Sequence, residues 1–548
     1  MKAVRAIALL SFFALLAFSF RSRAQCEALF KNLSVPILWM VFVFWIWALI
    51  PRLSKSLLRN AMIPLALSVL VFTLIPPYFR TLSDETNLLA ISKSIFESNS
   101  ILNILSEYWL VDHRTILHFL VPDRPLIFPF LIQILHRLFG FDASNPFRLN
   151  FWVLVLVLTL LYDTSKKLSG DLGGLICVMV ALCFPTILLY ATSGNFDLMH
   201  AGVFLWIHVL LYRSLKDDRF LPLFWMTLIL FCHIRPESIA LLCLMIAILG
   251  LTRAVNLGAL RKHWLILSLS PVMLLPILWQ HLLFFGRHRN GAIPLFSQSL
   301  AITHARQYFE SLFSFTYASS TALINLALVL LAGMILIVLW RQKRFKGFDR
   351  TLKTTAITAA ISSLSFLAIY LSHFRGEPNH PTQARYFLIF TLLSAFIPAV
   401  LSWRFPSRIL QAIVLALTVV AFGTQLTKAI FDHPILDNPM YRRVKFEIAL
   451  VQSLATPKTL VISERPGHFA TLGLFALHPH NANQLILEIR RALEHGNYDQ
   501  ILAFQQLDPD TQKPFSGEEL DPTFQKLQIG ELHFADRHRL VAWRIPTL

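Results

Sequence analysis

Two long apolar runs lie within residues 149–190, which read LNFWVLVLVLTLLYDTSKKLSGDLGGLICVMVALCFPTILLY. The first run ends before Asp163 and the second begins at Asp171, and the polar stretch between them carries Lys166 and Lys167. A helix needs about 20 mostly apolar residues to cross the hydrocarbon core of a bilayer, within a range of about 17 to 25. This stretch therefore predicts two membrane-spanning helices joined by a short basic loop.

The rest of the chain repeats this pattern. Of its 548 residues 55% are apolar and 15% are charged, whereas a soluble globular chain carries about 25% charged residues. Thirteen runs are candidate spans: 6–20, 33–50, 61–77, 149–162, 171–190, 197–212, 219–232, 236–252, 264–284, 320–340, 353–372, 386–402 and 408–428. The sequence therefore predicts an α-helical polytopic membrane protein with about 13 transmembrane helices.

The charge balance and the cysteines exclude other classes. Lys and Arg number 49 against 31 Asp and Glu, a net charge of +18, which in a membrane chain indicates topology and contact with lipid phosphates rather than nucleic-acid binding. The five cysteines are scattered, four of them inside apolar runs, and form no C-x-x-C pair. They indicate neither a disulfide scaffold nor a zinc finger.

Basic residues gather on alternate loops between the runs, and Lys and Arg in short loops favour the cytoplasmic side. These loops carry Lys2, Arg5, Arg52, Lys55, Arg59, Lys166, Lys167, Arg213, Lys216, Arg219, Arg253, Arg261, Lys262, Arg341, Lys343, Arg344, Lys346, Arg404 and Arg408. The opposite loops contain few lysines but many Arg, His and acidic residues. We expect those loops, and with an odd number of spans the C-terminus, to lie outside the cytoplasm of a plasma (inner) membrane protein.

Two N-terminal helices are predicted within residues 1–56. Residues 1–20 are similar to a signal peptide, but Arg21 and Arg23 favour an uncleaved helix.

Three regions depart from the pattern of short loops. The long outer loop 78–148 mixes apolar and polar residues at helical spacing over three stretches, which predicts helices in the interface plane. Those stretches are 84–97, 100–111 and 126–139. A shorter outer loop spans 285–319.

The third region is the tail, residues 429–548, which has no long apolar run. It alternates a helix at 441–454, a strand at 459–463, a helix at 481–495, a strand at 500–504 and strand-like segments at 523–534 and 538–545. This alternation predicts a small extracytoplasmic α/β domain.

Ser83, Asp84 and Glu85 stand at the outer mouth of the third predicted span. Two adjacent carboxylates at a bilayer boundary meet a reduced dielectric, which raises their pKa and suits a general base. Capping of the helix at 84–97 explains the same residues equally well.

Arginines and acids recur at the outer ends of other predicted helices. Arg124, within Asp123-Arg124-Pro125, and Arg148 have the donor geometry to bind phosphate, although they would equally reach lipid headgroups. An acidic residue at the start of a membrane helix, such as Asp197, is expected to cap the helix, to form an ion pair or to take part in the protein's function. The further members are Arg235 and Glu237 in a tight turn, Arg375, Glu377 and His380, and Arg385 before Tyr386. Together they form a composition suited to an anionic lipid head.

The order of these motifs over 57–403 resembles the GT-C superfamily of integral-membrane glycosyltransferases, which includes protein O-mannosyltransferases and lipid A aminoarabinose transferases. The resemblance rests on Asp84-Glu85, Arg124-Pro125-Leu126, Leu138-Phe139-Gly140 with Arg148, Asp197, Arg235 and Arg385-Tyr386-Phe387. It implies a transmembrane catalytic module over 57–428. The two extra N-terminal helices, and Arg124 and Arg235 where Lys or His is commoner, depart from the family.

The resemblance implies an inverting transferase that takes sugar from a polyprenyl phosphate or diphosphate. Asp84 would be the general base and Glu85 would orient it or bind substrate. Arg124, Arg235 and Arg385, with Tyr386, would bind the lipid donor and its phosphate, and Asp197 would organise the site or bind sugar. Some relatives use a divalent cation; histidines are scattered across the outer loops of this chain, and the sequence assigns no metal ligand or cofactor, with a divalent cation left open.

Two alternatives remain at this stage. A protein with thirteen helices could flip or export a lipid-linked sugar, although transporters usually bury ionisable groups near the bilayer midplane and often show repeats. An O-antigen ligase or polymerase would use similar lipids. The sequence leaves open the sugar and the acceptor, which could be a glycan, a lipid or a protein.

Overall fold

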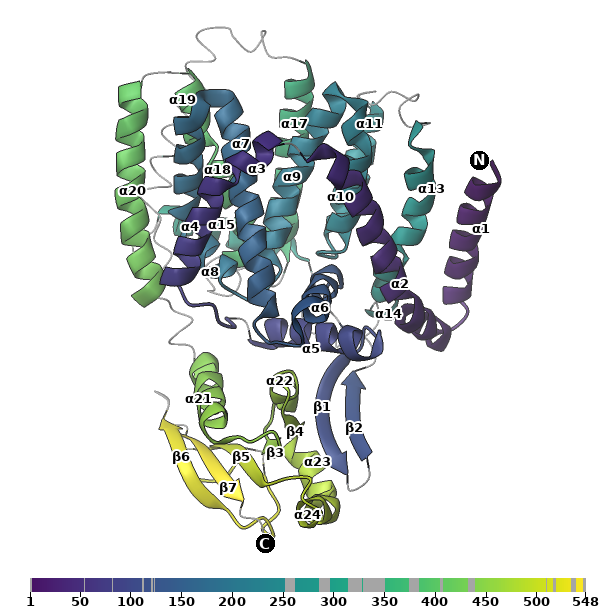
Figure 1. Ribbon diagram of the computed structural model, residues 1–548, viewed down its shortest axis with the longest axis vertical. Helices are drawn as coiled ribbons and strands as arrows, with labels where there is room; N and C mark the ends of the chain where they lie inside the picture. The colour runs from purple at the N-terminus through teal and green to yellow at the C-terminus, as the bar shows by residue number, and fades with distance from the viewer. Residues whose placement is uncertain are drawn as a thin grey trace. The chain divides into compact units, whose positions relative to one another are not determined.

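The computed structural model describes residues 2–53, 55–80, 82–110, 113–119, 122, 124–251, 262–284, 296–313, 328, 350–373, 384–404, 408–431, 439–508, 510–515, 519–533 and 539–545 (Figure 1). The chain divides into two compact units. The transmembrane unit comprises Met1–Tyr78, Pro125–Phe128 and Pro146–His433. The sheet unit comprises Phe79–Arg124, Pro129–Asn145 and Pro434–Leu548.

Helices make up the transmembrane unit. They are α1 (Lys2–Ser19), α2 (Arg23–Leu49), η1 (Ile50–Arg52), α3 (Lys55–Asn60), α4 (Met62–Leu74), α7 (Asn145–Leu182), α8 (Pro185–Ala191), α9 (Asp197–Lys216), η2 (Asp218–Phe220), α10 (Leu221–Cys232), α11 (Ser238–Leu251), α13 (Trp264–Met273), α14 (Leu275–Phe284), α15 (Gln298–Phe313), α17 (Arg350–Ser372), η4 (Ala384–Phe387), α18 (Leu388–Ser394), α19 (Ile397–Arg404) and α20 (Arg408–Phe431). These elements coincide with every predicted span except 320–340, which apart from Leu328 lies outside the described residues. The predicted outer loop 285–319 contains α15.

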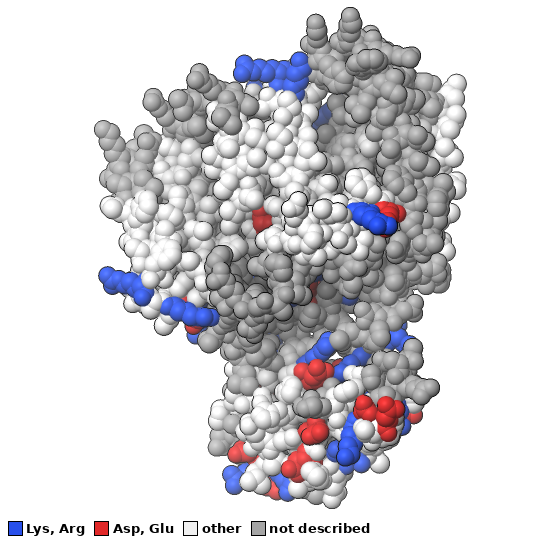
Figure 2. Space-filling model, turned by 180° about the vertical axis from the view of Figure 1, so that it is seen from behind, with Lys and Arg blue, Asp and Glu red and all other residues white. Residues whose placement is uncertain are grey.

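Among the described residues, six helical segments are long and apolar enough to cross a membrane. They are Arg23–Arg52, Ser56–Leu74, Asn145–Leu182, Asp197–Lys216, Trp264–Leu283 and Arg350–Ser372. Figure 2 shows the transmembrane unit almost without charge on the face it displays, whereas charged side chains crowd the sheet unit. The chain is therefore an integral multi-pass membrane protein.

The turn between the spans predicted at 149–162 and 171–190 lies inside α7. At Gly170 the backbone takes φ +79° and ψ −178°, which separates two helical halves. Open space surrounds the position that a Cβ would take, so the left-handed conformation, rather than crowding, explains the glycine. The predicted basic loop at Lys166 and Lys167 is thus a glycine-dependent break between two helices.

Helix α9 is the most buried of the six candidate spans, with 78% of its most apolar window buried. It packs against α10, α17 and α18. Gly202 lets α7 approach, because a Cβ there would lie 2.3 Å from Cγ2 of Val157. Both ends of α9 are therefore held by neighbouring helices, which matters for Asp197 at its first position.

The sheet unit contains one seven-stranded sheet in the order β2-β1-β4-β3-β5-β7-β6 (Figure 1). Its strands are β1 (Asn103–Leu110), β2 (His113–Phe119), β3 (Thr459–Ile462), β4 (Phe475–Leu477), β5 (Gln500–Leu507), β6 (Leu527–His533) and β7 (Arg539–Ile545). Its helices are α5 (Leu82–Ser98), most of α6 (Ile127–Phe139), α21 (Pro439–Leu454), α22 (Pro466–Ala470), α23 (Pro479–Gln484) and α24 (Ile486–Glu494). Strands β4, β3 and β5 are parallel, and the remaining pairs are antiparallel.

The helix predicted at 100–111 is wrong, because this segment holds strand β1. The strand forms a hairpin with β2 and also pairs with β4, through Glu107 and Ala476. Aromatic and β-branched residues such as Ile104 and Tyr108 suit a strand whose neighbours bury it. The predicted helices at 84–97 and 126–139 are present as α5 and α6, and each element predicted in the tail is present, with the helix at 481–495 divided into α23 and α24.

A buried ion pair joins α5 to the sheet. Lys93 Nζ lies 2.9 Å from Glu107 Oε2 on β1 and donates a hydrogen bond to the carbonyl of Ala470 at 2.8 Å. Both charged side chains are 3% exposed. This contact fixes the helix that carries Asp84 and Glu85 to the strand of the predicted outer loop.

Candidate functional site

One buried carboxylate in the transmembrane unit lies between two arginines. Asp197, whose side chain is 0% exposed, accepts a short hydrogen bond from Nη2 of Arg235 at Oδ1. Its Oδ2 lies 3.7 Å from Nη1 of Arg385. Arg235 also donates from Nη1 to Glu237 at 3.2 Å. Four of the charged residues singled out in the sequence therefore meet at the start of α9.

A hydrogen-bonded turn delivers Asp197 to this position. The side-chain amide nitrogen of Asn150, near the start of the first half of α7, donates to the backbone carbonyls of Ser193 at 2.6 Å and Asn195 at 2.7 Å. The side-chain oxygen of Asn195 then accepts from the backbone N–H of Phe196 at 2.8 Å. Asp197 follows in the first turn of α9, where the helix dipole favours a negative charge.

Aromatic rings cover the Arg235 guanidinium. Its Cζ lies 4.7 Å from the ring centre of Tyr386, 5.1 Å from Phe196 and 6.0 Å from Tyr370. Arg385 lies 5.4 Å from the same Tyr386 ring. Cations are attracted to aromatic faces at such distances. Tyr386, predicted as a substrate contact, therefore touches both arginines of the cluster.

The electrostatics of the cluster keep Arg235 charged. Burial alone lowers the pKa of a guanidinium, but the Asp197 carboxylate acts against burial and the net shift of the Arg235 pKa is upward. Because both Nη atoms face carboxylates, Arg235 holds Asp197 and Glu237 in place. The 3.7 Å separation of Arg385 from Asp197 is too long for a hydrogen bond, so Asp197 accepts a hydrogen bond from Arg235 and makes a longer electrostatic contact with Arg385.

A second pair lies in the sheet unit, at the start of α5. Asp84 Oδ1 is 2.5 Å from Nη2 of Arg124. The two side chains are 11% and 19% exposed respectively. Glu85 is completely buried, and both of its oxygens accept from the backbone N–H of Arg80 at 3.1 Å. The adjacent carboxylates therefore have different partners, a guanidinium for Asp84 and the chain before the helix for Glu85.

This difference separates the two interpretations of the acidic pair. A capping box joins residues three apart at the start of a helix, whereas Glu85 reaches back five residues to Arg80, two residues before α5, so Glu85 holds the chain that enters the helix. Asp84 accepts from a side-chain cation instead. The side chain of Ser83 lies outside the described residues.

The other predicted positions are dispersed or not described. Arg148 is exposed on α7, as expected for contact with lipid headgroups. Asp123, Arg375, Glu377 and His380 lie outside the described residues, as do Arg287, His288 and Arg289 of the predicted outer loop. His304 of that loop is buried in α15 and its Nδ1 is 2.9 Å from the carbonyl of Leu371.

Sequence reasoning missed three residues of the Asp197 cluster. Tyr370 and Phe196 contact Arg235, and Asn150 holds the turn before Asp197. Asn150 gives a usable signal, because an amide inside an apolar run requires a polar partner. The two aromatic residues gave no signal, since they do not stand out among the 13% of the chain that is aromatic.

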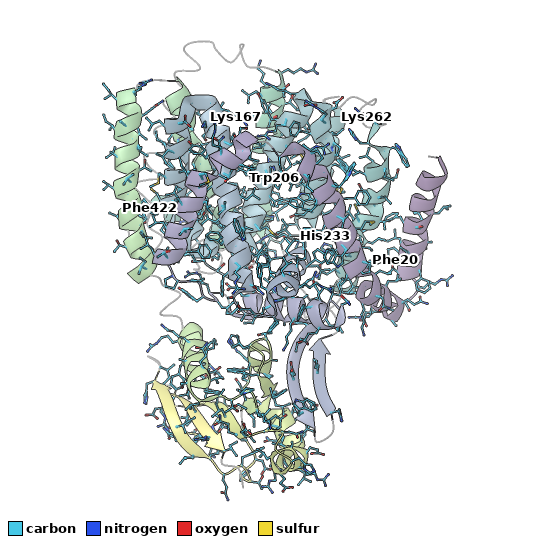
Figure 3. All side chains as sticks on the ribbon, viewed as in Figure 1. Phe20, Lys167, Trp206, His233, Lys262 and Phe422 are labelled. Atoms are coloured by element: carbon cyan, nitrogen blue, oxygen red, sulfur yellow. The ribbon has the colours of Figure 1, made fainter. Side chains whose placement is uncertain are left out.

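Among the residues that the structure describes, no group of three or more His, Cys, Asp or Glu side chains is arranged to hold a metal ion. Figure 3 shows Lys167 and Lys262 near one end of the helices and His233, two residues before Arg235, further toward the other end, with Trp206 of α9 between them. These lysines and His233 therefore lie at different levels along the helices.

The fold has a counterpart among solved structures. The crystal structure of ArnT from Cupriavidus metallidurans bound to undecaprenyl phosphate aligns with a TM-score of 0.51 and 14% sequence identity, over 88% of this chain and 97% of ArnT. This chain has the fold of ArnT. The resemblance to GT-C glycosyltransferases is thus confirmed at the level of the fold.

Two further structures align less closely. ArnT from the same organism in the apo state gives a TM-score of 0.42 at 15% identity, over 88% of this chain and 97% of that chain. The arabinosyltransferase EmbB from Mycobacterium smegmatis gives 0.30 at 12% identity, over 73% of this chain and 44% of EmbB. No family model and no curated protein sequence matches the chain. The ArnT-like fold is therefore recognised through structure.

Proposed function

We propose that this protein is an inverting glycosyltransferase that moves a sugar from a polyprenyl phosphate or diphosphate to an acceptor at the extracytoplasmic face of the membrane. The observation that carries the proposal is the Asp197, Arg235 and Arg385 cluster within an ArnT-like fold. The first ArnT structure holds undecaprenyl phosphate, and a cluster with two guanidiniums is suited to a lipid phosphate.

The distribution of charge supports an extracytoplasmic position for the proposed site. Lys167 and Lys262 lie near one end of the helices and His233 lies further toward the other end (Figure 3), and lysines in short loops favour the cytoplasm. The end that carries Arg235 would then face outward. A lipid-linked sugar presents its polar head at the interface, so groups that bind it belong at such a helix end.

In the reaction that we propose, Asp84 accepts the proton of the acceptor hydroxyl as the oxygen attacks the anomeric carbon. The bond from that carbon to the carrier phosphate breaks, and the phosphate leaves with the electron pair. Arg124 orients the Asp84 carboxylate through their 2.5 Å contact. Orientation matters because a general base must lie within hydrogen-bond reach of the proton that it accepts.

The Asp197 cluster would stabilise the departing phosphate. Arg235 is fixed by Asp197 and Glu237, which makes it a preorganised source of positive charge. Arg385, whose Nη1 lies 3.7 Å from Asp197, is our candidate for direct contact with phosphate, and Tyr386 for contact with the donor beside it. Charge placed in advance costs no reorganisation when the negative charge develops.

The test uses the full-length protein purified in detergent. A panel of polyprenyl-phosphate sugars is incubated with it and with delipidated envelope acceptors, and loss of donor and formation of glycosylated product are followed by mass spectrometry. Product formation without vesicles supports transfer. Uptake or flipping in proteoliposomes without any product would instead favour transport.

A further inference from the structure

A small cavity lies beside Arg235, at the turn between α10 and α11. His233, Arg235, Ile277 and Gln280 are among its walls. It offers about 10 Å³ to a water-sized sphere, which is close to the roughly 10–15 Å³ that one ordered water requires. The cavity thus has room for a single small molecule.

His233 lines this cavity and has one hydrogen-bond acceptor without a partner among the described residues. Its Nε2 lies 2.8 Å from the carbonyl oxygen of Met273, and because a carbonyl only accepts, Nε2 carries the proton and Nδ1 carries the lone pair. The residue is 2% exposed, and among the described residues Nδ1 has no hydrogen-bond partner. Burial lowers the pKa of His233 to about 4, so the ring is neutral.

Arg235 presents the matching donor. Its two Nη atoms face Asp197 and Glu237, which leaves the Nε–H group. Within the part of the chain that the structure describes, Nε is buried and makes no hydrogen bond. A buried donor without an acceptor is unfavourable, so Nε–H and the lone pair of His233 both require a partner at this cavity.

The chemistry of the two atoms defines what fits. A cation would be repelled by Arg235, and an anion without a proton could not donate to the lone pair of His233. One water accepts from Nε–H and donates to Nδ1, and Gln280 on the cavity wall offers a further polar group. We propose that a single ordered water bridges His233 and Arg235 and makes His233 a positioning residue for the guanidinium.

This bridge would extend the hydrogen-bonded cluster. It runs from the Met273 carbonyl on α13 through His233 and the water to Arg235, and from Arg235 to Asp197 on α9. The plane of the guanidinium is then fixed at all three of its nitrogens. The presence of the water is independent of the proposed function, whereas its effect on donor use rests on that function.

The direct test is electron cryomicroscopy of the full-length protein in lipid nanodiscs, at a resolution that shows ordered waters. We expect a spherical density within hydrogen-bond distance of both Nδ1 of His233 and Nε of Arg235, and we expect the Ile277→Phe variant, which fills the cavity without changing a polar group, to lose it. Ile277→Val, the matched control, should retain it. Well-resolved side chains with no density between them in the unchanged protein would overturn the proposal.

The kinetic test asks whether the water positions Arg235. With a polyprenyl-phosphate sugar that the protein turns over, Ile277→Phe and His233→Leu should lower kcat roughly five- to tenfold and change the donor KM less than twofold, as expected for one bridging hydrogen bond that positions a group acting on the departing phosphate. His233→Gln, which keeps an acceptor, should restore part of the difference.

The two tests separate the possible failures. If His233→Leu does not fold, Ile277→Phe still removes the water while His233 and Arg235 remain. Unchanged kcat in Ile277→Phe, with the density lost, would refute the positioning role. Absence of turnover for every donor would refute the proposed function, and the density would still decide whether the water is present.

Discussion

Asp84 and Asp197 each face an arginine, but the first pair is partly exposed and the second is buried. The Asp84 side chain is 11% exposed and meets Arg124. The Asp197 side chain is 0% exposed and meets both Arg235 and Arg385. A group that exchanges a proton with a substrate must be reached by it, whereas a buried ion pair needs its partners to remain stable. The comparison supports our proposal that Asp84 takes the proton and that Asp197 organises the binding site.

The largest effect on activity is expected from Asp84→Asn. The amide cannot accept the proton of the acceptor, so transfer should fall about 10²- to 10⁴-fold, the usual contribution of a general base. Membrane insertion and abundance should not change. Product formation is measured by mass spectrometry, with Glu97→Gln on the exposed face of the same helix as the control. Full activity in Asp84→Asn would remove the assignment of the base.

Arg235→Ala should destabilise the protein more than any change at the Asp84 pair. Removing one partner of a buried ion pair leaves an uncompensated charge and costs about 3–5 kcal/mol. Thermal unfolding in detergent, followed by tryptophan fluorescence, should show a lower Tm. Asp217→Asn, which breaks an exposed pair with Arg219, is the control and should change Tm little. Equal Tm values for the two variants would contradict the contrast between buried and accessible pairs.

Arg385→Ala should separate binding from stability. Asp197 keeps its hydrogen bond to Arg235 when Arg385 is removed, so Tm should fall less than in Arg235→Ala. Loss of a charged contact to phosphate should raise the donor KM about tenfold or more. Arg408→Ala, at an exposed position on α20, is the control. If neither Arg385→Ala nor Arg124→Ala changes the donor KM, neither arginine binds the carrier phosphate.

The smallest effect is expected from Glu85→Gln. The amide retains one oxygen for the backbone N–H of Arg80 but loses the charge near the start of α5, so the free energy of unfolding should fall by about 1 kcal/mol. Transfer should remain within a few-fold of the unchanged protein. A loss of transfer as large as that of Asp84→Asn, at normal stability, would show that Glu85 acts in the reaction.

The sequence singles out most of the charged residues that pair in the structure, but not their partners. Asp84, Arg124, Asp197, Arg235 and Arg385 are predicted as site residues because charged groups at the ends of apolar runs need a partner or a function, and their roles in a site stay a prediction. Arg235 and Glu237 share a tight turn and do pair, whereas Asp197, the second partner of Arg235, comes from another helix.

The misassigned strand β1 shows the same limit for the fold. Local spacing at 100–111 is compatible with a helix, but β1 pairs through Glu107 with Ala476 in the tail. A strand gains stability from neighbours that lie elsewhere in the chain, so its own residues carry only part of the information.

By itself, the sequence determined that the chain enters a membrane. It also determined which segments form most of the helices and which charged residues stand at their ends. Hydropathy over about 20 residues is a local and additive property, so it can be read along the chain. Only the tertiary structure decided which carboxylate meets which guanidinium, which of two adjacent acids holds the chain before its helix and which segment becomes a strand. Those outcomes depend on contacts between residues far apart in the chain, whose energies exist only once the elements have packed together.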